Sequence, residues 1–306
     1  MRPELVRATE LLQHKTPEAF EEAVGLLQNT IYSFSMKMCG HPEDAEDTTQ
    51  EVLFRSLGHL AKIQDPRALA VWLYTVTRNR CWRMRRKPAG APARTLSLNE
   101  LMPDDLELGR LVQDAAKNPE GTLLLTERHD LLHQSVLRIP APLRIVLILH
   151  DMEELATEQV AQVLNLQPGT VRVRLHRARL AVRKEMSAIL DPTPPLSDPA
   201  FPVLKEIPDT SKPRKRPPEC RELFAGLSEY LDGRAEPETC DQMRHHMDGC
   251  RACIQFLRSL RDAIDRCRAL EVPCNPIVAA RLRSVLTTEY LHILGIPIPE
   301  NFPVTV

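Results

Sequence analysis

The segment HHMDGCRACIQF, residues 245–256, places a histidine and two cysteines at the spacing of metal ligands. His246, Cys250 and Cys253 form an H-x3-C-x2-C pattern, and Cys220 lies upstream of it. Three thiolates and one imidazole make a closed tetrahedral zinc site, which leaves no position for a catalytic water. The sequence therefore predicts a structural or regulatory Zn²⁺ ion held by these four residues.

Other cysteines and a histidine leave alternatives open. Cys240 or His245 could replace one member of the set, but we favour Cys220 because a small helical hairpin would separate it naturally from the cluster. Unliganded thiols are the other alternative. Cys267 and Cys274, further along, are either buried apolar thiols or redox-sensitive groups. The N-terminus lacks the apolar core of a signal peptide, so eight cysteines favour metal ligation over a disulfide framework.

A second chemical signature lies in TEQVAQVLNLQPGTVRVRLHRARLAVRKEM, residues 157–186. The pattern predicts a short helix over 157–164, a tight turn at 165–167 and a longer helix opened by Pro168, which is helix-turn-helix geometry. Between Pro168 and Lys184 there are six lysines and arginines and no acidic residue. The longer helix therefore offers positive charge to phosphates as well as donors to base edges.

Helical periodicity separates the two sides of this longer helix. Spacings of four, three and four predict a buried stripe of Val171, Leu175, Ala178 and Val182. The opposite side is expected to face outward and contact DNA through Arg172, Val173, His176 and Arg177. The alternative is a solvated basic face on a bundle helix, although such a face normally mixes charges of both signs.

The N-terminal part of the chain carries one acidic and one basic helical surface. HPEDAEDTTQEVLFRSLGHL predicts an acidic face that suits a basic protein surface, formed by Asp44, Glu46, Asp47, Gln50 and Glu51. The following AVWLYTVTRNRCWRMRRK places tryptophan and tyrosine beside arginines, which suits unstacked bases and a single-stranded backbone. The DNA-contacting candidates on this second surface are Asn79, Arg80, Arg83 and Arg86.

The elements that position these residues are predicted to be helices throughout. Leucine and alanine recur at helical spacing, aromatic residues make up only 4% of the chain, and strand-like alternation is sparse, so the fold class is all-α. The 306 residues contain 40 basic and 41 acidic side chains, so the distribution of charge matters more than its sum. No run of eighteen apolar residues occurs, and we expect a cytoplasmic protein without a membrane segment.

The motifs at 157–186 and in the N-terminal block resemble regions 4 and 2 of an extracytoplasmic-function (ECF) sigma factor of the sigma-70 family. The resemblance implies that region 4 contacts the minus-35 promoter element, while the acidic helix binds the clamp helices of the RNA polymerase β′ subunit. It implies that the basic-aromatic helix melts the minus-10 element, with Asn79 at the position of the family's helix asparagine. The loop 63–68 corresponds to the segment that captures a flipped base.

The cysteine-rich segment resembles the zinc-binding anti-sigma domain over about residues 219–260. Members of that family usually form a separate chain that blocks the polymerase-binding surface of an ECF sigma factor. In this sequence the domain follows the sigma-like blocks in the same polypeptide. The resemblance therefore implies intramolecular contact and regulation in cis, with its sign left open.

These features divide the chain into six expected parts: region 2 at 1–87, a linker at 88–118, region 4 at 119–190, a proline-rich tether at 191–218, a zinc-binding domain at 219–274, and a C-terminal helix and tail at 275–306. The predicted function is a non-enzymatic sigma factor that binds core RNA polymerase and promoter DNA. A stand-alone helix-turn-helix regulator is the main alternative, and a zinc hydrolase is disfavoured because the cluster contains a single acid, Asp248.

Overall fold

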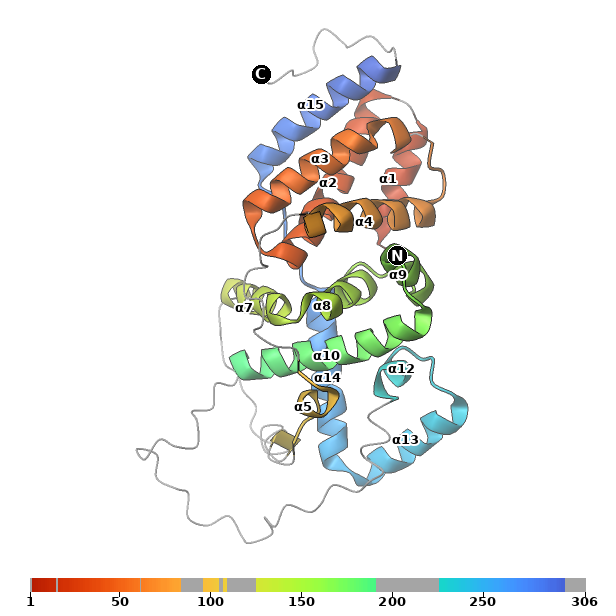
Figure 1. Cartoon of the computed structure of the whole chain (residues 1–306), viewed down its shortest axis with the longest axis vertical. Helices are drawn as coiled ribbons and strands as arrows, with labels where there is room; N and C mark the ends of the chain where they lie inside the picture. Colours follow the sequence, from red (N-terminus) through yellow and green to blue (C-terminus); the bar gives the residue numbers. More distant parts are fainter. Residues whose placement is uncertain are drawn as a thin grey trace, which may run out of the picture. The chain divides into compact units, whose positions relative to one another are not determined.

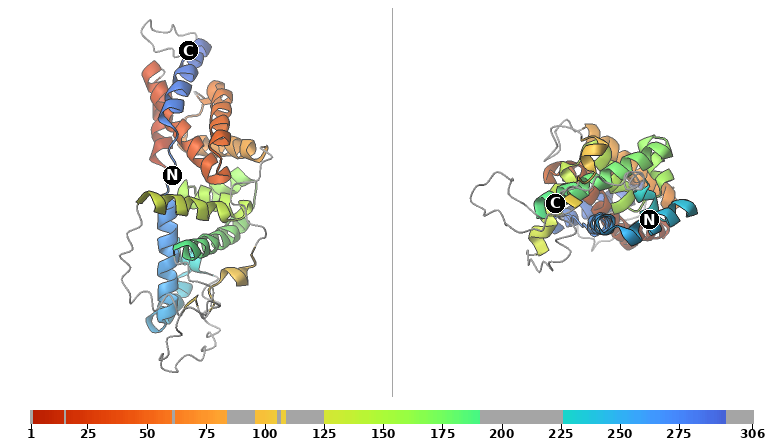
Figure 2. Two further views of the ribbon diagram at one scale, coloured as in Figure 1. Left: turned by 90° about the vertical axis from the view of Figure 1, so that its left-hand side faces the viewer. Right: turned by 90° about the horizontal axis from the view of Figure 1, so that it is seen from below.

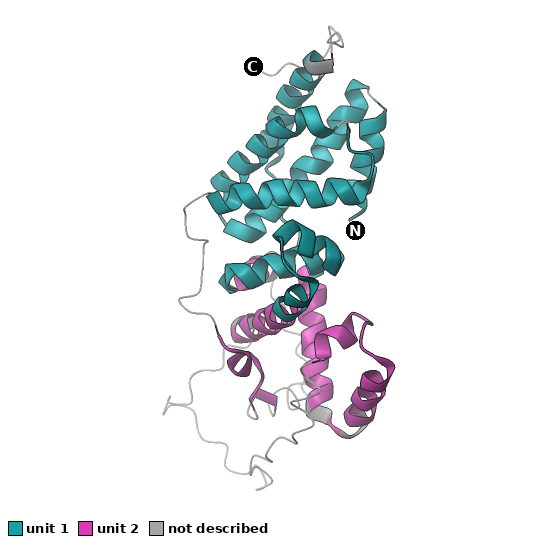
Figure 3. Ribbon diagram, turned by 45° about the vertical axis from the view of Figure 1, so that its right-hand side comes forward, with its two compact units in different colours: residues 1–92, 136–174, 268–306 teal, residues 93–135, 175–267 magenta. Residues whose placement is uncertain are grey.

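The computed structural model describes residues 2–14, 16–60, 62–83, 96–104, 107–108, 125–190 and 226–294. The regular elements within these residues are helices, which confirms the predicted all-α class. The chain forms two compact units, each built from segments distant in sequence (Figure 3). Unit 1 comprises residues 1–92, 136–174 and 268–306, and unit 2 comprises residues 93–135 and 175–267. In the described part of the chain, no helix combines the length and apolar character needed to span a membrane.

The N-terminal part of unit 1 is a helical bundle of α1 (Pro3–Gln13), α2 (Pro17–Cys39), α3 (Pro42–Leu60) and α4 (Pro66–Arg83). Each helix begins at a proline, whose fixed φ suits the first helical turn and whose missing N–H is not needed there. The Thr16 hydroxyl caps α2 by accepting a hydrogen bond from the Ala19 N–H at 3.3 Å. Gly40, with φ of 74°, ends α2 in the left-handed conformation that glycine adopts without strain.

Helix α15 (Pro276–Leu294), from the far end of the chain, packs against α2 and α3 (Figures 1 and 2). The ring of Tyr290 stacks on that of Phe20, with centroids 3.5 Å apart. Before the helix begins, Cys274 accepts a hydrogen bond from the Gln28 amide at 3.9 Å. The C-terminal segment, which had no predicted role, therefore adds a helix to the N-terminal bundle.

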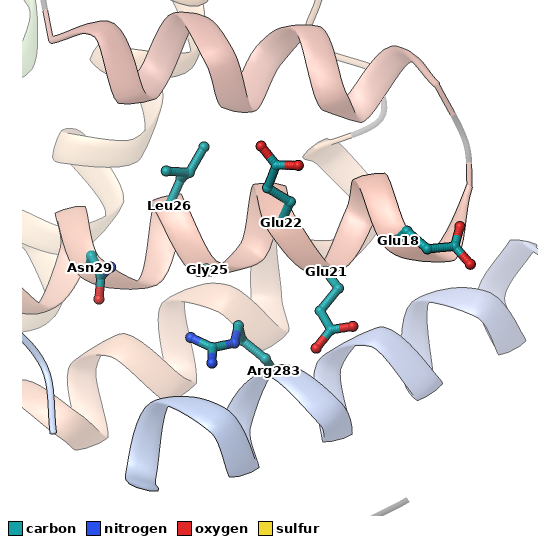
Figure 4. A pocket seen from close by; sticks show the side chains of 7 residues that line it. All are labelled: Glu18, Glu21, Glu22, Gly25, Leu26, Asn29 and Arg283. Carbon is teal, nitrogen blue, oxygen red and sulfur yellow. The ribbon is translucent and has the colours of Figure 1, made fainter. Parts of the chain in front are cut away.

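Gly25 permits a close approach between α2 and α15. A Cβ atom at this position would lie 3.2 Å from Cδ of Arg283. Figure 4 shows Arg283 lying across Gly25 while Glu21 points toward α15. The absence of a side chain at position 25 therefore makes room for Arg283. A groove of about 450 Å³ beside this crossing is lined by Glu18, Glu21, Glu22, Gly25, Leu26, Asn29 and Arg283.

A buried polar cluster joins the segment 136–174 to the bundle within unit 1. Glu153, which follows the π-helix η1 (Ile148–Met152), is completely buried and accepts hydrogen bonds from Lys37 Nζ at 3.0 Å and the Tyr74 hydroxyl at 2.7 Å. Arg2 Nε lies 3.0 Å from the same carboxylate. Burial and the charge of Glu153 raise the pKa of Tyr74 well above its ordinary value, so the hydroxyl remains a donor.

Arg144 makes a second polar connection in unit 1. This residue lies in α8 (Ala141–Leu147) and is fully buried. Its guanidinium donates hydrogen bonds to the backbone carbonyls of Met38 at the end of α2 and of Leu137 and Ile139. Burial lowers the pKa of Arg144 to about 10, so the side chain remains charged at neutral pH. Helix α9 (Thr157–Leu164) contacts α4 nearby.

Unit 2 surrounds the second half of α10 (Pro168–Leu190). The other helices that contribute to it are α5 (Leu98–Leu101), part of α7 (Leu125–Arg138), α12 (Leu227–Leu231), α13 (Pro237–Gly249) and α14 (Arg251–Arg268). Leu175 and Val182 of α10 and Phe256 and Leu260 of α14 are among its buried apolar side chains. The segment expected to bind zinc therefore shares a compact unit with the helix expected to contact DNA.

Replacing Lys37 with Met is expected to destabilise the chain by about 3–5 kcal/mol, because it removes one cation from a fully buried carboxylate. The free energy of unfolding in urea measures the change. Arg7→Met is the matched control, since Arg7 forms an exposed ion pair with Glu22 at 3.3 Å that should contribute about 1 kcal/mol or less. Equal losses in the two variants would contradict the importance assigned to the buried cluster.

Candidate nucleic-acid interface and metal centre

The apolar side of α10 agrees with the sequence prediction. Val171, Leu175, Ala178 and Val182 are all buried, which confirms the stripe inferred from helical spacing. The turn before α10 contains Asn165 in the left-handed conformation, with φ of 53°. Asparagine adopts this region more readily than most residues, so the turn can reverse the chain direction between α9 and α10. The predicted helix-turn-helix is therefore present.

The opposite side of α10 differs from the prediction in part. Arg172 is exposed, as is Val173 with 61% of its surface accessible, and both lie in unit 1. His176 was expected to face outward, but this expectation is wrong, since the side chain is only 9% exposed within unit 2. Its Nδ1 lies 3.0 Å from the Ser228 hydroxyl of α12. Arg177, half-buried, donates a hydrogen bond to the Leu96 carbonyl at 3.0 Å.

Two further arginines of α10 contact the C-terminal segment. Arg179 is fully buried and its guanidinium donates to Asp232 Oδ1 at 2.7 Å and to the Ser228 carbonyl at 3.3 Å. The guanidinium of Arg183 lies over the Phe256 ring, 4.5 Å from its centroid. From the sequence, both were expected only as part of the basic run of α10. Their spacing of three and seven residues from His176 places all three on one helical face, and this signal could have grouped them.

The basic-aromatic surface lies on the C-terminal half of α4. Asn79 and Arg83 are exposed, whereas Arg86 falls outside the described residues. Arg80 forms an ion pair with Glu51 of α3 at 2.5 Å. Trp82 exposes 53% of its surface, so part of its ring is accessible for base stacking. Arg78, 5.3 Å from the Trp82 centroid, donates hydrogen bonds to Asn79 Oδ1.

The acidic surface on α3 is smaller than its spacing predicted. Asp47 and Gln50 are exposed, and Glu46 and Glu51 are half-buried. Asp44 is only 6% exposed, so its predicted place on the exposed face is wrong. It lies in the first turn of α3, where a carboxylate interacts favourably with the positive end of the helix dipole.

The predicted metal ligands converge at the junction of α13 and α14. One ligand atom from each of His246, Cys250 and Cys253 lies within 4.8 Å of the others. His246 Nε2 and Cys253 Sγ are 3.2 Å apart. Tetrahedral zinc with sulfur and nitrogen ligands separates its donor atoms by about 3.5–3.8 Å, so the three side chains fit this ion.

The other candidate ligands are Cys220, Cys240 and His245, and the described cluster does not include them. Cys220, the expected fourth ligand, falls outside the described residues. The Cys240 thiol instead donates a hydrogen bond to the Ala235 carbonyl at 3.5 Å. His245 is exposed and is not part of the described cluster. The zinc assignment therefore rests on His246, Cys250 and Cys253, with the fourth position open to Cys220.

Comparison with protein families identifies three matching segments. Residues 24–90 match Sigma-70 region 2, residues 129–182 match Sigma-70, region 4, and residues 220–253 match the family described as "Putative zinc-finger". The zinc-finger match begins at Cys220 and ends at Cys253, the outer members of the predicted ligand set. The order of the three segments confirms the architecture inferred from the motifs.

Comparison with individual proteins gives sigma factors as relatives. The chain is 29% identical over 171 residues to the ECF RNA polymerase sigma factor SigW of Bacillus subtilis, covering 55% of this chain and 89% of the relative. It is 27% identical over 173 residues to the RNA polymerase sigma factor YlaC of the same organism, covering 56% and 95%. It is also 27% identical over 183 residues to the RNA polymerase sigma-H factor of Pseudomonas aeruginosa, covering 59% and 93%. The region 2 match favours a sigma factor over the stand-alone regulator.

The purified chain is expected to retain zinc, and Cys250→Ser is expected to lose it because a serine hydroxyl is a much poorer zinc ligand than a thiolate. Elemental analysis after gel filtration measures the metal content. Cys240→Ser serves as the control and should keep the ion, while Cys220→Ser tests the fourth ligand. Zinc retained by Cys250→Ser, or lost from Cys240→Ser, would contradict the assigned set.

His176 gives unit 2 a specific pH dependence. Burial, with the nearby charge of Arg179 as a second cause, lowers the pKa of His176 to about 4. The unfolded chain binds this proton near pH 6.5, so the stability contributed by neutral His176 is present above that pH and falls as the pH drops toward 4.

The expected loss from this residue between pH 7 and pH 5 is about 2 kcal/mol in the free energy of unfolding. Urea unfolding at both pH values measures it, and His176→Gln removes the titrating group as a control. The variant should therefore lose less stability than the wild type over the same interval. An identical pH dependence for the two chains would show that His176 is not held neutral by burial.

Proposed function

We propose that the chain is an extracytoplasmic-function sigma factor that directs core RNA polymerase to promoters under cis regulation by its own C-terminal segment. The matches to Sigma-70 regions 2 and 4, the zinc-finger match that follows them and the sigma-factor relatives support this proposal. The observation that carries the regulatory part is the burial of His176 and Arg179 of α10 beneath residues of α12 and its following turn. The activity is recruitment and DNA recognition rather than catalysis.

The proposed DNA contacts divide between the two sigma-like regions. Asn79, Arg80 and Arg83 of α4 would contact the minus-10 element, with exposed Trp82 beside them as a stacking surface. Arg86, which falls outside the described residues, is proposed to contribute to the same contact. On α10, Arg172, Val173, His176 and Arg177 would contact the minus-35 element in the major groove. Arg172 and Val173 are exposed in this structure, whereas His176 must first be uncovered.

The proposed polymerase contact is the acidic surface of α3. Asp47 and Gln50 are its exposed members, with Glu46 and Glu51 at its half-buried edge and Asp44 behind them. The exposed and half-buried members would bind the β′ clamp helices, as the resemblance to the family implies, and buried Asp44 would support the helix rather than touch the polymerase. Glu51 also holds Arg80, so polymerase binding and minus-10 recognition would share one ion pair.

The C-terminal segment contacts both functional regions. In unit 2, Ser228 and Asp232 bind His176 and Arg179 of α10, whose polar groups would otherwise be available to DNA. In unit 1, Cys274 and Ala279 pack in one apolar cluster with Ala45, which lies between two residues of the acidic surface. Burial is the main cause that raises the pKa of Cys274, and the negative charge of Glu46 is the second. The Cys274 thiol therefore lies near the Glu46 carboxylate. We propose that this state is inhibited.

Zinc would hold the C-terminal segment in the form that makes these contacts. His246 lies on α13 and Cys253 on α14, so an ion shared by them fixes the two helices at their junction. When bound, zinc supplies cross-linking of these helices rather than a reactive water. Because regulator and target share one chain, dilution does not separate them, and release requires a change in the regulator itself.

Transcription from promoter DNA by purified core polymerase tests this proposal. The full chain should initiate weakly, and a chain ending at Leu190 should initiate more strongly because it lacks the covering segment. Absence of a specific start with either chain would contradict the sigma-factor function, and lower activity after truncation would make the C-terminal segment an activator or folding aid.

Asp232→Asn provides a sharper test than truncation. It removes the charge that pairs with fully buried Arg179, which should weaken the covering contact and raise initiation by about tenfold or more, given the 3–5 kcal/mol typical of a broken buried pair. Asp241→Asn is the matched control because Asp241 pairs with exposed Arg244 on its own helix. Equal activity of the two variants would argue against inhibition through α12.

A further inference from the structure

The acidic linker between the two sigma-like regions also contacts α10. Within unit 2, Arg177 Nη2 donates to the Leu96 carbonyl at 3.0 Å, and Lys184 Nζ donates to the Glu100 carbonyl. Arg183 forms an ion pair with the Glu107 carboxylate. Three of the six basic residues between Pro168 and Lys184 are therefore occupied by oxygen atoms of the linker.

The linker is held beside α10 by buried side chains and local structure as well as by these hydrogen bonds. Leu101 and Leu108 are buried, and Pro103 between them is buried as well. Ser97 and Glu100 form a capping box around the short helix α5, in which the Glu100 carboxylate accepts the Ser97 N–H at 2.8 Å. This local structure presents the Leu96 and Glu100 carbonyls to α10.

The contacts have the chemistry of phosphate recognition. Guanidinium and ammonium groups that donate to negative or partially negative oxygens are the groups that bind the DNA backbone. The linker sequence is acidic, with Glu100, Asp104, Asp105 and Glu107, while the facing stretch of α10 has no acidic residue. An arginine or lysine side chain that donates its hydrogen bonds to the linker cannot donate the same bonds to a DNA phosphate.

We infer that the linker segment formed by residues 96–104, Glu107 and Leu108 competes with DNA for the basic face of α10. The inference rests on the proposed role of α10 in DNA binding. It adds to the C-terminal segment a second inhibitory contact on that helix, one that does not depend on zinc. Because the linker precedes α10, it stays in place in a chain that ends at Leu190. Release of the C-terminal segment therefore leaves part of α10 occupied.

Competition of this kind has a quantitative signature. The apparent dissociation constant for DNA equals the intrinsic constant divided by the fraction of chains whose linker is displaced. Each phosphate that a released cation neutralises also steepens the salt dependence of log Kobs by about 0.9. A weakened linker should therefore bind DNA more tightly and with a steeper salt dependence.

Fluorescence anisotropy of the full chain with a labelled random-sequence DNA duplex, over a range of KCl concentrations, tests the inference. Glu107→Gln keeps a hydrogen-bond acceptor but removes the charge that pairs with Arg183, so the duplex should bind about fivefold more tightly. Leu101→Ala combined with Leu108→Ala removes the two buried anchors without changing charge and should tighten binding further. Glu289→Gln, an exposed site on α15, is the control for the lost negative charge and should match the wild type.

Hydrogen exchange gives an independent measurement in the unmodified chain. The Leu101 and Met102 amides donate to the Ser97 and Leu98 carbonyls at 3.1 and 3.0 Å. Saturating duplex should accelerate their exchange because the linker leaves its seat on α10. Unchanged affinity in both linker variants, or unchanged exchange on DNA binding, would overturn the inference while leaving the sigma-factor function intact. Failure of every chain, including one ending at Leu190, to bind duplex would overturn both.

Discussion

The structure depends on how the chain neutralises the charges of α10, the helix proposed to contact DNA. Helix α10 carries a basic stretch without an acid of its own, and a buried guanidinium is costly unless it is paired. Asp232 and the Ser228 carbonyl supply partners for Arg179, and Phe256 and Glu107 surround Arg183. These contacts bring segments from both sides of α10 in sequence into one compact unit. The positive charge of α10, which is proposed to bind DNA, therefore also holds these segments within unit 2.

Polar contacts of this kind suit a state that has to be reversed. A buried ion pair adds little net stability relative to an apolar contact because both charges lose their hydration, yet removing one partner is costly. In the proposed mechanism, displacement by DNA or polymerase would replace each lost partner with another polar one, so no charge would be left buried alone. The Glu153 cluster in unit 1 has the same character, since it joins the segment 136–174 to α2 and α4 through Lys37 and Tyr74. The high cost of an unpaired buried charge makes these contacts specific, and the small net stability of each pair makes them reversible.

The sequence predicted the features that depend on local pattern. The bounds of α9, the buried stripe of α10 and the convergence of His246, Cys250 and Cys253 all follow from periodicity or ligand spacing. It did not predict the burial of His176 and Asp44, because periodicity identifies a polar face without identifying what packs against it. The partners of Arg179 lie about fifty residues away, and α15 returns to α2 from the far end of the chain. Such contacts depend on tertiary arrangement, which spacing along one helix does not encode.

Arginine-specific chemical labelling followed by mass spectrometry tests most directly whether α10 is covered by its own chain. In the full zinc-loaded protein, exposed Arg172 should react readily while Arg179 is protected, and in a chain ending at Leu190 both should react. Arg172 thus acts as the internal reference for reagent access. Reaction of Arg179 at the rate of Arg172 in the full chain would contradict the account.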